Sequence, residues 1–210
     1  MCGRRVGAGH TTMYNYIMTT QTSPHPTHRA FLIAGPSGVG KGTVVKELVK
    51  RKPDIWLSIS ATTRQPRPGE VDGESYYFVT DDEFQAMVDA GDMLEWAFIH
   101  RKNYYGTPRK PVEEALKQGK TALLEIDLAG ARQVRKTMPD VYQIFLMPPS
   151  VEHLEERLHG RGTEDEEAIA RRMVTAREEM AAQSEFDAVV LNDSVARATE
   201  EILHIMGEIV

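Results

Sequence analysis

The stretch that decides the fold is Gly35-Pro36-Ser37-Gly38-Val39-Gly40-Lys41-Gly42-Thr43. It follows an apolar run, Phe31 to Ala34, and precedes residues Lys41 to Arg51, whose apolar side chains recur at helical spacing. Glycines between a buried strand and a helix let backbone N–H groups converge on phosphate oxygens at the positive end of the helix dipole. The sequence therefore predicts a phosphate-binding loop (P-loop) in which Lys41 contacts the outer phosphates. The alternative is a glycine-rich turn with an incidental lysine.

Gly42 departs from the usual P-loop. Most such loops carry a serine or threonine here, whose hydroxyl ligates Mg²⁺. Thr43 lies about 100° further around the helix, so the sequence does not predict that it ligates the metal directly. Nucleoside-monophosphate kinases tolerate glycine at this position, with Mg²⁺ held mainly by phosphates and water, whereas most GTPases and ATPases do not. The pattern favours a kinase whose Mg²⁺ arrives with ATP.

Outside this loop, apolar runs alternate with segments of helical spacing. The runs are 122–126, 144–146 and 188–191, and the helical segments are 128–137, 151–160 and 165–183. Repeated alternation of strands and helices is typical of a parallel sheet covered by helices. The fold class is therefore predicted to be α/β, a P-loop parallel sheet core with helices on both faces.

The pattern changes between Ile59 and Arg109. Residues 76–79 and 94–98 look like antiparallel strands that flank a short helix. Capping-box spacing predicts where two helices begin, at Thr80 with Glu83 and again at 163–166 before the long helix. Residues 59–109 are thus predicted to form an inserted domain with a small mixed sheet of its own.

The amino-acid composition argues against several classes of function. The 25 Lys and Arg against 31 Asp and Glu give a net charge of −6, which argues against a general nucleic-acid binder. The single cysteine, Cys2, cannot form an intrachain disulfide, which favours the cytoplasm. No apolar run reaches the roughly 18 residues of a membrane span, so no membrane partner is expected. Residues 1–28 lack the apolar segment of a signal peptide and are expected to be a disordered extension.

A second motif, Ser60-Ala61-Thr62-Thr63-Arg64-Gln65-Pro66-Arg67-Pro68-Gly69-Glu70, presents two arginines on a stiff loop. Two guanidinium groups three residues apart match a phosphate dianion, for which arginine is better suited than lysine. The alternative is an ordinary exposed basic loop.

Further motifs follow in a fixed order. They are Asp72-Gly73 leading to Tyr76, Glu95-Trp96-Ala97, Asn103-Tyr104-Tyr105-Gly106-Thr107, Glu125-Ile126-Asp127, and Arg157 through Arg161-Gly162-Thr163. With the P-loop and residues 60–70, they make the chain resemble the guanylate kinases over residues 29–210. The resemblance implies an ATP:GMP phosphotransferase that produces ADP and GDP. It also implies the boundaries of the parts: a P-loop core of 29–58, 110–150 and 174–210, a GMP-binding domain of 59–109, and a helical lid of 151–173.

On the acceptor side, the resemblance implies that Glu95 selects the base. A carboxylate accepts hydrogen bonds from guanine N1–H and the N2 amine together, and adenine offers no such pair of donors. The other implied GMP-binding residues are Ser60 and Thr107 at the base, Arg64, Arg67, Tyr76 and Tyr105 at the phosphate, and Gly106 and Asp127. Taken singly, either tyrosine could be a half-buried sheet residue, and Glu95 could be a solvated strand carboxylate.

On the donor side, the resemblance implies that residues 35–43 bind ATP with Arg157, Arg161 and Asn192. Arg161 and Arg172 would close over the transferring phosphoryl group and act with Lys41 and Arg64 in catalysis. The alternative for the lid arginines is a solvated helix face paired with glutamates. The seven histidines form no metal-ligand pattern, so no protein metal site is predicted beyond the Mg²⁺ that accompanies ATP.

Two other functions remain to be weighed. A GTPase would use Asp127-Leu128-Ala129-Gly130 as a switch motif, but the chain has no Asn-Lys-x-Asp guanine motif and carries Gly42. A non-catalytic guanylate-kinase-like interaction module typically loses the P-loop, whereas Lys41 and its glycines are intact. The stretch Phe98 to Lys102 is longer than is usual in the family and is expected to lengthen a hairpin tip. The sequence leaves the choice between monomer and homo-oligomer open.

Overall fold

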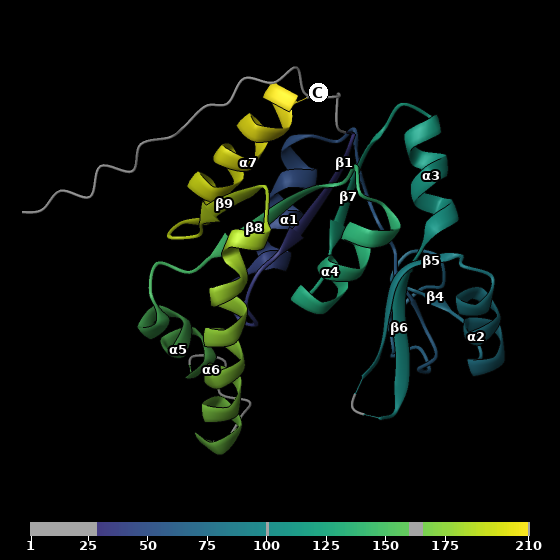
Figure 1. Ribbon diagram of the computed structural model, residues 1–210, viewed down its shortest axis with the longest axis horizontal. Helices are drawn as coiled ribbons and strands as arrows, with labels where there is room; N and C mark the ends of the chain where they lie inside the picture. The colour runs from purple at the N-terminus through teal and green to yellow at the C-terminus, as the bar shows by residue number, and fades with distance from the viewer. Residues whose placement is uncertain (1–28, 100, 160–165, 210) are drawn as a thin grey trace, which may run out of the picture.

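The computed structural model describes residues 29–99, 101–159 and 166–209. Its core is a parallel sheet in the order β2-β7-β1-β8-β9 (Figure 1). The strands are β1 (Ala30–Ala34), β2 (Ile55–Leu57), β7 (Thr121–Glu125), β8 (Tyr142–Met147) and β9 (Ala188–Leu191). The parallel sheet is as predicted, and β2 adds an edge strand that the sequence pattern did not indicate. Because all the strands run the same way, their carboxyl ends meet at one edge, where α/β folds bind ligands.

Helices cover both faces of this sheet, as predicted. Successive strand residues point to opposite faces, so Phe31 and Leu32 of β1 enter different layers, and both are fully buried. Phe31 packs in a cluster with residues of α1 and α7, and Leu32 in one with residues of α3 and α4. These helices are α1 (Lys41–Arg51), α3 (Arg109–Lys117), α4 (Leu128–Thr137) and α7 (Val195–Ile209).

The inserted segment forms a second, mixed sheet in the order β4-β3-β6-β5. Its elements are β3 (Ala61–Thr62), β4 (Tyr77–Phe78), β5 (Met93–Ile99), β6 (Asn103–Pro108) and helix α2 (Asp81–Asp89). The expected antiparallel relation between 76–79 and 94–98 is wrong. These strands lie at opposite edges, because β5 turns back at once into β6, and β3 then pairs with β6 on one side and β4 on the other. The hairpin tip expected at Phe98–Lys102 is present: β5 and β6 pair up to Ile99 and Asn103, with His100 outside the described residues.

The predicted start of α2 is confirmed. The Thr80 hydroxyl accepts a hydrogen bond from the Glu83 N–H at 3.2 Å, and the Thr80 N–H donates to the Glu83 carboxylate at 2.8 Å. This reciprocal capping box gives hydrogen-bond acceptors to two backbone N–H groups that would otherwise have no partner at the start of the helix. The second expected capping box, at 163–166, lies outside the described residues.

Helices α5 (Val151–His159) and α6 (Glu166–Ala181) lie on the opposite side of the core from the inserted sheet (Figure 1). They pack on each other through Leu154, Ile169 and Met173. The core sheet therefore stands between two smaller parts, each with its own apolar cluster. Residues 1–28, expected to be an extension, lie outside the described residues. No helix in the described part of the chain is long and apolar enough to cross a membrane.

Candidate active site

The P-loop joins β1 to α1, and its glycines meet specific backbone demands. Gly40 caps α1 with φ of 98°, a left-handed conformation that side chains disfavour. At Gly35 a Cβ atom would lie 2.3 Å from the Leu146 carbonyl oxygen of β8, closer than any such contact allows. Val39 is fully buried and anchors the loop in the core. The loop is thus held firmly at the carboxyl edge of the sheet, ahead of the N-terminus of α1.

Lys41 is drawn back into this loop. Its Nζ donates to the carbonyl oxygens of Gly35 at 2.6 Å and Pro36 at 3.4 Å. Burial lowers the pKa of Lys41, and the carboxylates of Glu179, Glu125 and Asp127 oppose that shift. The ammonium group therefore lies in a partly desolvated place surrounded by acidic groups.

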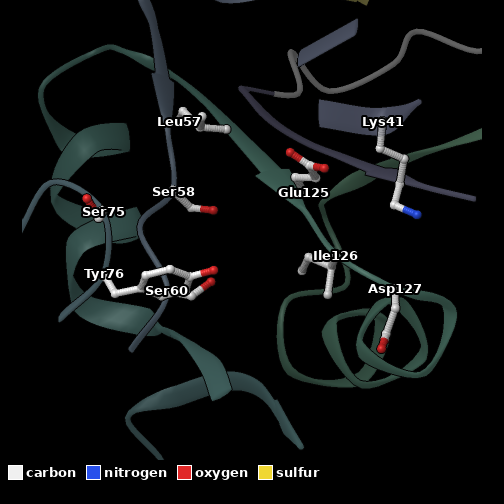
Figure 2. A pocket seen from close by; sticks show the side chains of 9 residues that line it. All are labelled: Lys41, Leu57, Ser58, Ser60, Ser75, Tyr76, Glu125, Ile126 and Asp127. Atoms are coloured by element: carbon white, nitrogen blue, oxygen red, sulfur yellow. The ribbon is translucent and has the colours of Figure 1, made fainter. Parts of the chain in front are cut away.

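Two cavities meet at this lysine. The first has a volume of about 420 Å³ and is lined by Lys41, Leu57, Ser58, Ser60, Ser75, Tyr76, Glu125, Ile126 and Asp127. Figure 2 shows Lys41, Glu125 and Asp127 on the core side of this cavity, with Ser60, Ser75 and Tyr76 facing them. The second, of about 340 Å³, lies on the P-loop and is lined by Ser37, Gly38, Gly40, Lys41, Gly42, Thr43, Lys46 and Glu125. Lys41 and Glu125 line both cavities, so a group passing from one to the other would pass these two side chains.

Glu125 lines both cavities, although no role was predicted for it from the sequence. It ends β7, the strand that pairs with β1, and its carboxylate faces the P-loop. A Cβ added at Gly42 would lie 3.4 Å from Glu125 Oε1 and 3.8 Å from Oε2. The place where other P-loops present a hydroxyl is therefore flanked by a carboxylate, and oxygen ligands of this kind suit Mg²⁺. Its position at the carboxyl end of a strand beside β1 was the signal that could have identified it.

Arg64 forms an ion pair with the carboxylate of Glu70. Its two Nη atoms each donate to a carboxylate oxygen of Glu70 at 2.6 Å, and the Arg67 N–H donates to the same carboxylate at 2.7 Å. This two-pronged contact lowers the pKa of Glu70 to about 2. Arg64 also lies 4.9 Å from the centre of the Tyr76 ring, which meets Tyr105 edge-on at 6.0 Å. The structure brings Arg64, Tyr76 and Tyr105 together as expected, and it leaves the Arg67 side chain exposed.

Glu95 is buried, with 8% of its surface exposed, and it is held by Thr107. The Thr107 hydroxyl donates to Glu95 Oε1 at 2.7 Å. Burial raises the pKa of Glu95 to about 7, and the charge of Asp127 adds to this, while the Thr107 hydrogen bond opposes it. Gly106 lets β6 approach closely, because a Cβ there would lie 2.5 Å from the Glu95 carbonyl oxygen. Thr107 therefore contacts the carboxylate itself, and Gly106 acts through packing of the strands.

Comparison with known proteins decides the family, since a model of the guanylate kinase family matches residues 27–209. The chain belongs to the guanylate kinase family. It is 58% identical over 174 residues to a guanylate kinase of Synechococcus sp. (strain CC9902), which covers 83% of this chain and 92% of the relative. It is 56% identical over 179 residues to one of Thermobifida fusca (strain YX), covering 85% and 91%. The crystal structure of guanylate kinase from Anaplasma phagocytophilum superposes with a TM-score of 0.65 at 32% identity, covering 85% of each chain.

The chain is accordingly an ATP:GMP phosphotransferase that produces ADP and GDP. This agrees with the function expected from the sequence. The GTPase and interaction-module alternatives are set aside, because relatives at 52% to 58% identity over most of the chain are guanylate kinases.

The P-loop of this guanylate kinase is hydrogen-bonded to α6. Arg172 donates to the Ser37 hydroxyl at 2.6 Å, and the Glu179 carboxylate accepts from the Ser37 N–H at 3.1 Å. The two residues are seven apart, so they lie on one face of α6. Both of them bind Ser37, at the tip of the P-loop. Glu179 was not predicted as a site residue, because no local sequence pattern connects it to Ser37, which is 142 residues away. Of the other arginines expected in a lid, the Arg157 side chain and Arg161 lie outside the described residues.

Asn192, expected near the adenine, follows β9 and is 2% exposed. Its Nδ2 donates to the Val39 carbonyl oxygen at 2.8 Å. A Cβ at Gly40 would lie 3.0 Å from the same nitrogen. The Asn192 side chain thus binds the backbone of the P-loop.

The raised pKa of Glu95 has a consequence for stability. The folded state holds this proton more tightly than an unfolded chain, whose carboxyl has a pKa of 4.5, so the free energy of unfolding decreases as the pH rises from about 4.5 to about 7. A shift of this size corresponds to on the order of 3 kcal/mol. Glu95→Gln carries no charge to desolvate. We expect it to raise the melting temperature at pH 8 by several degrees and to have little effect at pH 5. Thermal unfolding of both proteins at the two pH values measures this, and parallel pH dependences would contradict it.

Proposed function

We propose that the two cavities are the nucleotide sites of this kinase, with GMP in the cavity between the core and the inserted sheet and ATP on the P-loop. The observation that carries this assignment is the pair of residues that both cavities share, Lys41 and Glu125. In-line transfer requires that the donor and acceptor phosphates meet at one place, and a lysine is the side chain that neutralises the charge developing there. The predicted domain roles, 59–109 for GMP and 151–173 as a lid, follow from the same assignment.

In the acceptor site, the buried Glu95 would accept from guanine N1–H and the N2 amine, with Thr107 orienting the carboxylate and Ser60 near the base. The GMP phosphate would take the place of Glu70 at Arg64. The bidentate contact of Glu70 supports this step, because it shows that the guanidinium is already oriented toward an anion with two oxygens. Tyr76 and Tyr105, beside Arg64, would add neutral hydroxyl donors, and Arg67 would join from the same loop.

In the donor site, the backbone N–H groups of residues 35–43 and Lys41 would bind the phosphates of ATP, with Arg157, Arg161 and Arg172 closing from the lid and Asn192 supporting the loop. The residues present fit a Mg²⁺ ion that arrives with ATP, because Gly42 leaves space beside the Glu125 carboxylate. Glu125 and Asp127 would hold the ion, directly or through water. When bound, Mg²⁺ neutralises charge on the phosphate oxygens.

Catalysis then consists of positioning and charge neutralisation, with no covalent intermediate. Lys41 and the arginines stabilise the transferring phosphoryl group, and closure of the inserted sheet and of α5 and α6 toward the core would exclude water that could hydrolyse ATP. We also propose that the enzyme works in the cytoplasm, in keeping with its single cysteine.

A coupled assay of ADP release tests the choice of acceptor and the need for Mg²⁺. The purified protein is supplied with ATP and Mg²⁺ and with GMP, AMP or no acceptor, and each reaction is repeated with excess EDTA. We expect rapid ADP release with GMP, slow release with AMP, near-background release without acceptor, and loss of activity in EDTA. Equal rates with and without GMP would indicate an ATPase, and undiminished activity in EDTA would refute the proposed role of Mg²⁺.

A further inference from the structure

Strand β5, which carries Glu95, lies at the edge of the inserted sheet and is covered there by α4 of the core. An edge strand leaves alternate backbone N–H and C=O groups without a strand partner. Here the groups at Trp96 are taken by a side chain. The Trp96 N–H donates to Gln133 Oε1 at 3.1 Å, and Gln133 Nε2 donates to the Trp96 carbonyl oxygen at 3.0 Å. One amide thus makes the pair of hydrogen bonds that a neighbouring strand would make.

A second side chain of α4 acts on the other side of Glu95. The Thr137 hydroxyl donates to the Leu94 carbonyl oxygen at 2.6 Å, and Leu94 is itself fully buried among residues that include α4 side chains. The backbone is therefore fixed to α4 at both residues that flank Glu95. Gln133 and Thr137 are four residues apart, so they lie on the same face of the helix.

The same face of α4 also sets the surroundings of the Glu95 carboxylate. Gly130, three residues before Gln133, has its missing Cβ only 3.0 Å from Glu95 Oε2. Asp127 caps the helix by accepting from the Gly130 N–H at 2.7 Å, and its charge acts on Glu95. A small rotation or slide of β5 along α4 would therefore move the carboxylate relative to this first turn and to the cavity that Asp127 lines.

We propose that Gln133 is a positioning residue for guanine selection: its amide fixes β5 on α4 and thereby fixes where the Glu95 carboxylate meets the base. Gln133 does not line either nucleotide cavity. It acts through the backbone of Trp96, one residue from Glu95. This inference rests on the proposal that Glu95 reads guanine.

The test compares GMP with IMP, which lacks the N2 amine but is otherwise alike, in kcat/KM measurements at saturating Mg-ATP. Gln133→Met keeps the length of the side chain and removes both hydrogen bonds. We expect the KM for GMP to rise and the preference for GMP over IMP to fall, each by about tenfold, because a displaced Glu95 carboxylate loses most of its hydrogen bond to the N2 amine, which IMP does not have. We expect kcat and the KM for ATP to stay within about threefold of wild type. Gln85→Met, the same change at an exposed amide of α2, is the matched control and should alter neither.

A double-mutant cycle separates positioning from general support of the fold. If Gln133 acts through Glu95, Gln133→Met adds no further loss of GMP preference in a Glu95→Gln background. Equal losses with GMP and IMP, or an unchanged preference with a lowered melting temperature, would overturn the proposal. If Gln133→Met fails to fold, Gln133→Glu keeps the acceptor for the Trp96 N–H, and we expect a smaller loss of preference from it; an unchanged preference would again refute the role. If Glu95→Gln alone leaves the preference intact, it is the role of Glu95 that fails.

Discussion

Lys41→Met should lower kcat for phosphoryl transfer from ATP to GMP by about 10³-fold or more. Methionine keeps the length and most of the apolar packing of the side chain but removes the charge at the point where the two cavities meet. The developing charge on the transferring group then faces Glu125 and Asp127 without a cation to offset them. The measurement is ADP release at saturating ATP and GMP. The folded state should persist, because the substitution also removes a partly desolvated charge whose burial opposes folding.

Lys46→Met is the matched control. Lys46 lines the same P-loop cavity, but it is exposed to solvent, so its charge is screened and we expect its loss to cost less than tenfold. Melting temperatures of both variants show whether the fold is kept. Turnover of Lys41→Met within tenfold of wild type, or an equal loss in the two variants, would remove Lys41 from its assigned role.

The parts of the fold that the sequence predicted are those with a strong local signal. The helix over Lys41–Arg51 has an apolar face and a glycine at its start, and β9 is a short apolar run between polar segments. The capping box of α2 needs only Thr80 and Glu83, three residues apart. In each case the residues that determine the element are neighbours in the chain, so the pattern is visible without knowing the fold.

The strands that the sequence missed depend on distant partners. β3 has two residues, and it exists because it lies between β4 and β6. β6 contains Gly106 and ends at Pro108, which are poor strand formers by themselves. It is stabilised by pairing with β5 along its whole length. The pairing order of the inserted sheet could not be read from the sequence, because the hairpin and the two short strands compete for the same edges.

In the candidate site, too, the residues with a local sequence signal were predicted and those that depend on distant partners were not. The P-loop and the loop of Arg64 were found because their residues are consecutive, and the resemblance to guanylate kinases supplied Glu95 with a role. Glu179 and Gln133 have no such signal, since they contact Ser37 and Trp96 across 142 and 37 residues. Both act on the backbone of a residue that touches or adjoins the predicted site. Side chains that position a site from another element were therefore the ones that needed the structure.

The second large loss of activity is expected when Glu95 is replaced by glutamine. In Glu95→Gln one acceptor oxygen becomes an amide donor, which must then face a donor of guanine. One hydrogen bond is lost and one repulsive contact is gained in a buried site, so we expect a loss of ~3 kcal/mol, about 10²-fold, in kcat/KM for GMP. The Thr107 hydroxyl can still donate to the remaining carbonyl oxygen, so the side chain should keep its orientation. AMP never uses the carboxylate, and its much lower activity should change far less.

The pH dependence distinguishes base recognition from support of the fold. Because the pKa of Glu95 is about 7, the wild-type carboxyl is increasingly protonated below that pH and loses an acceptor for guanine. The kcat/KM for GMP should therefore fall as the pH decreases through 7, and this ionisation should be absent from the profile of Glu95→Gln. Thr107→Val, which removes the hydroxyl donor at similar volume, should lose less than Glu95→Gln and should shift the ionisation upward, since the hydrogen bond that opposes the raised pKa is gone. If GMP and AMP lose activity in equal proportion in Glu95→Gln, the carboxylate supports closure or folding, and recognition of the base passes to Ser60 and Thr107.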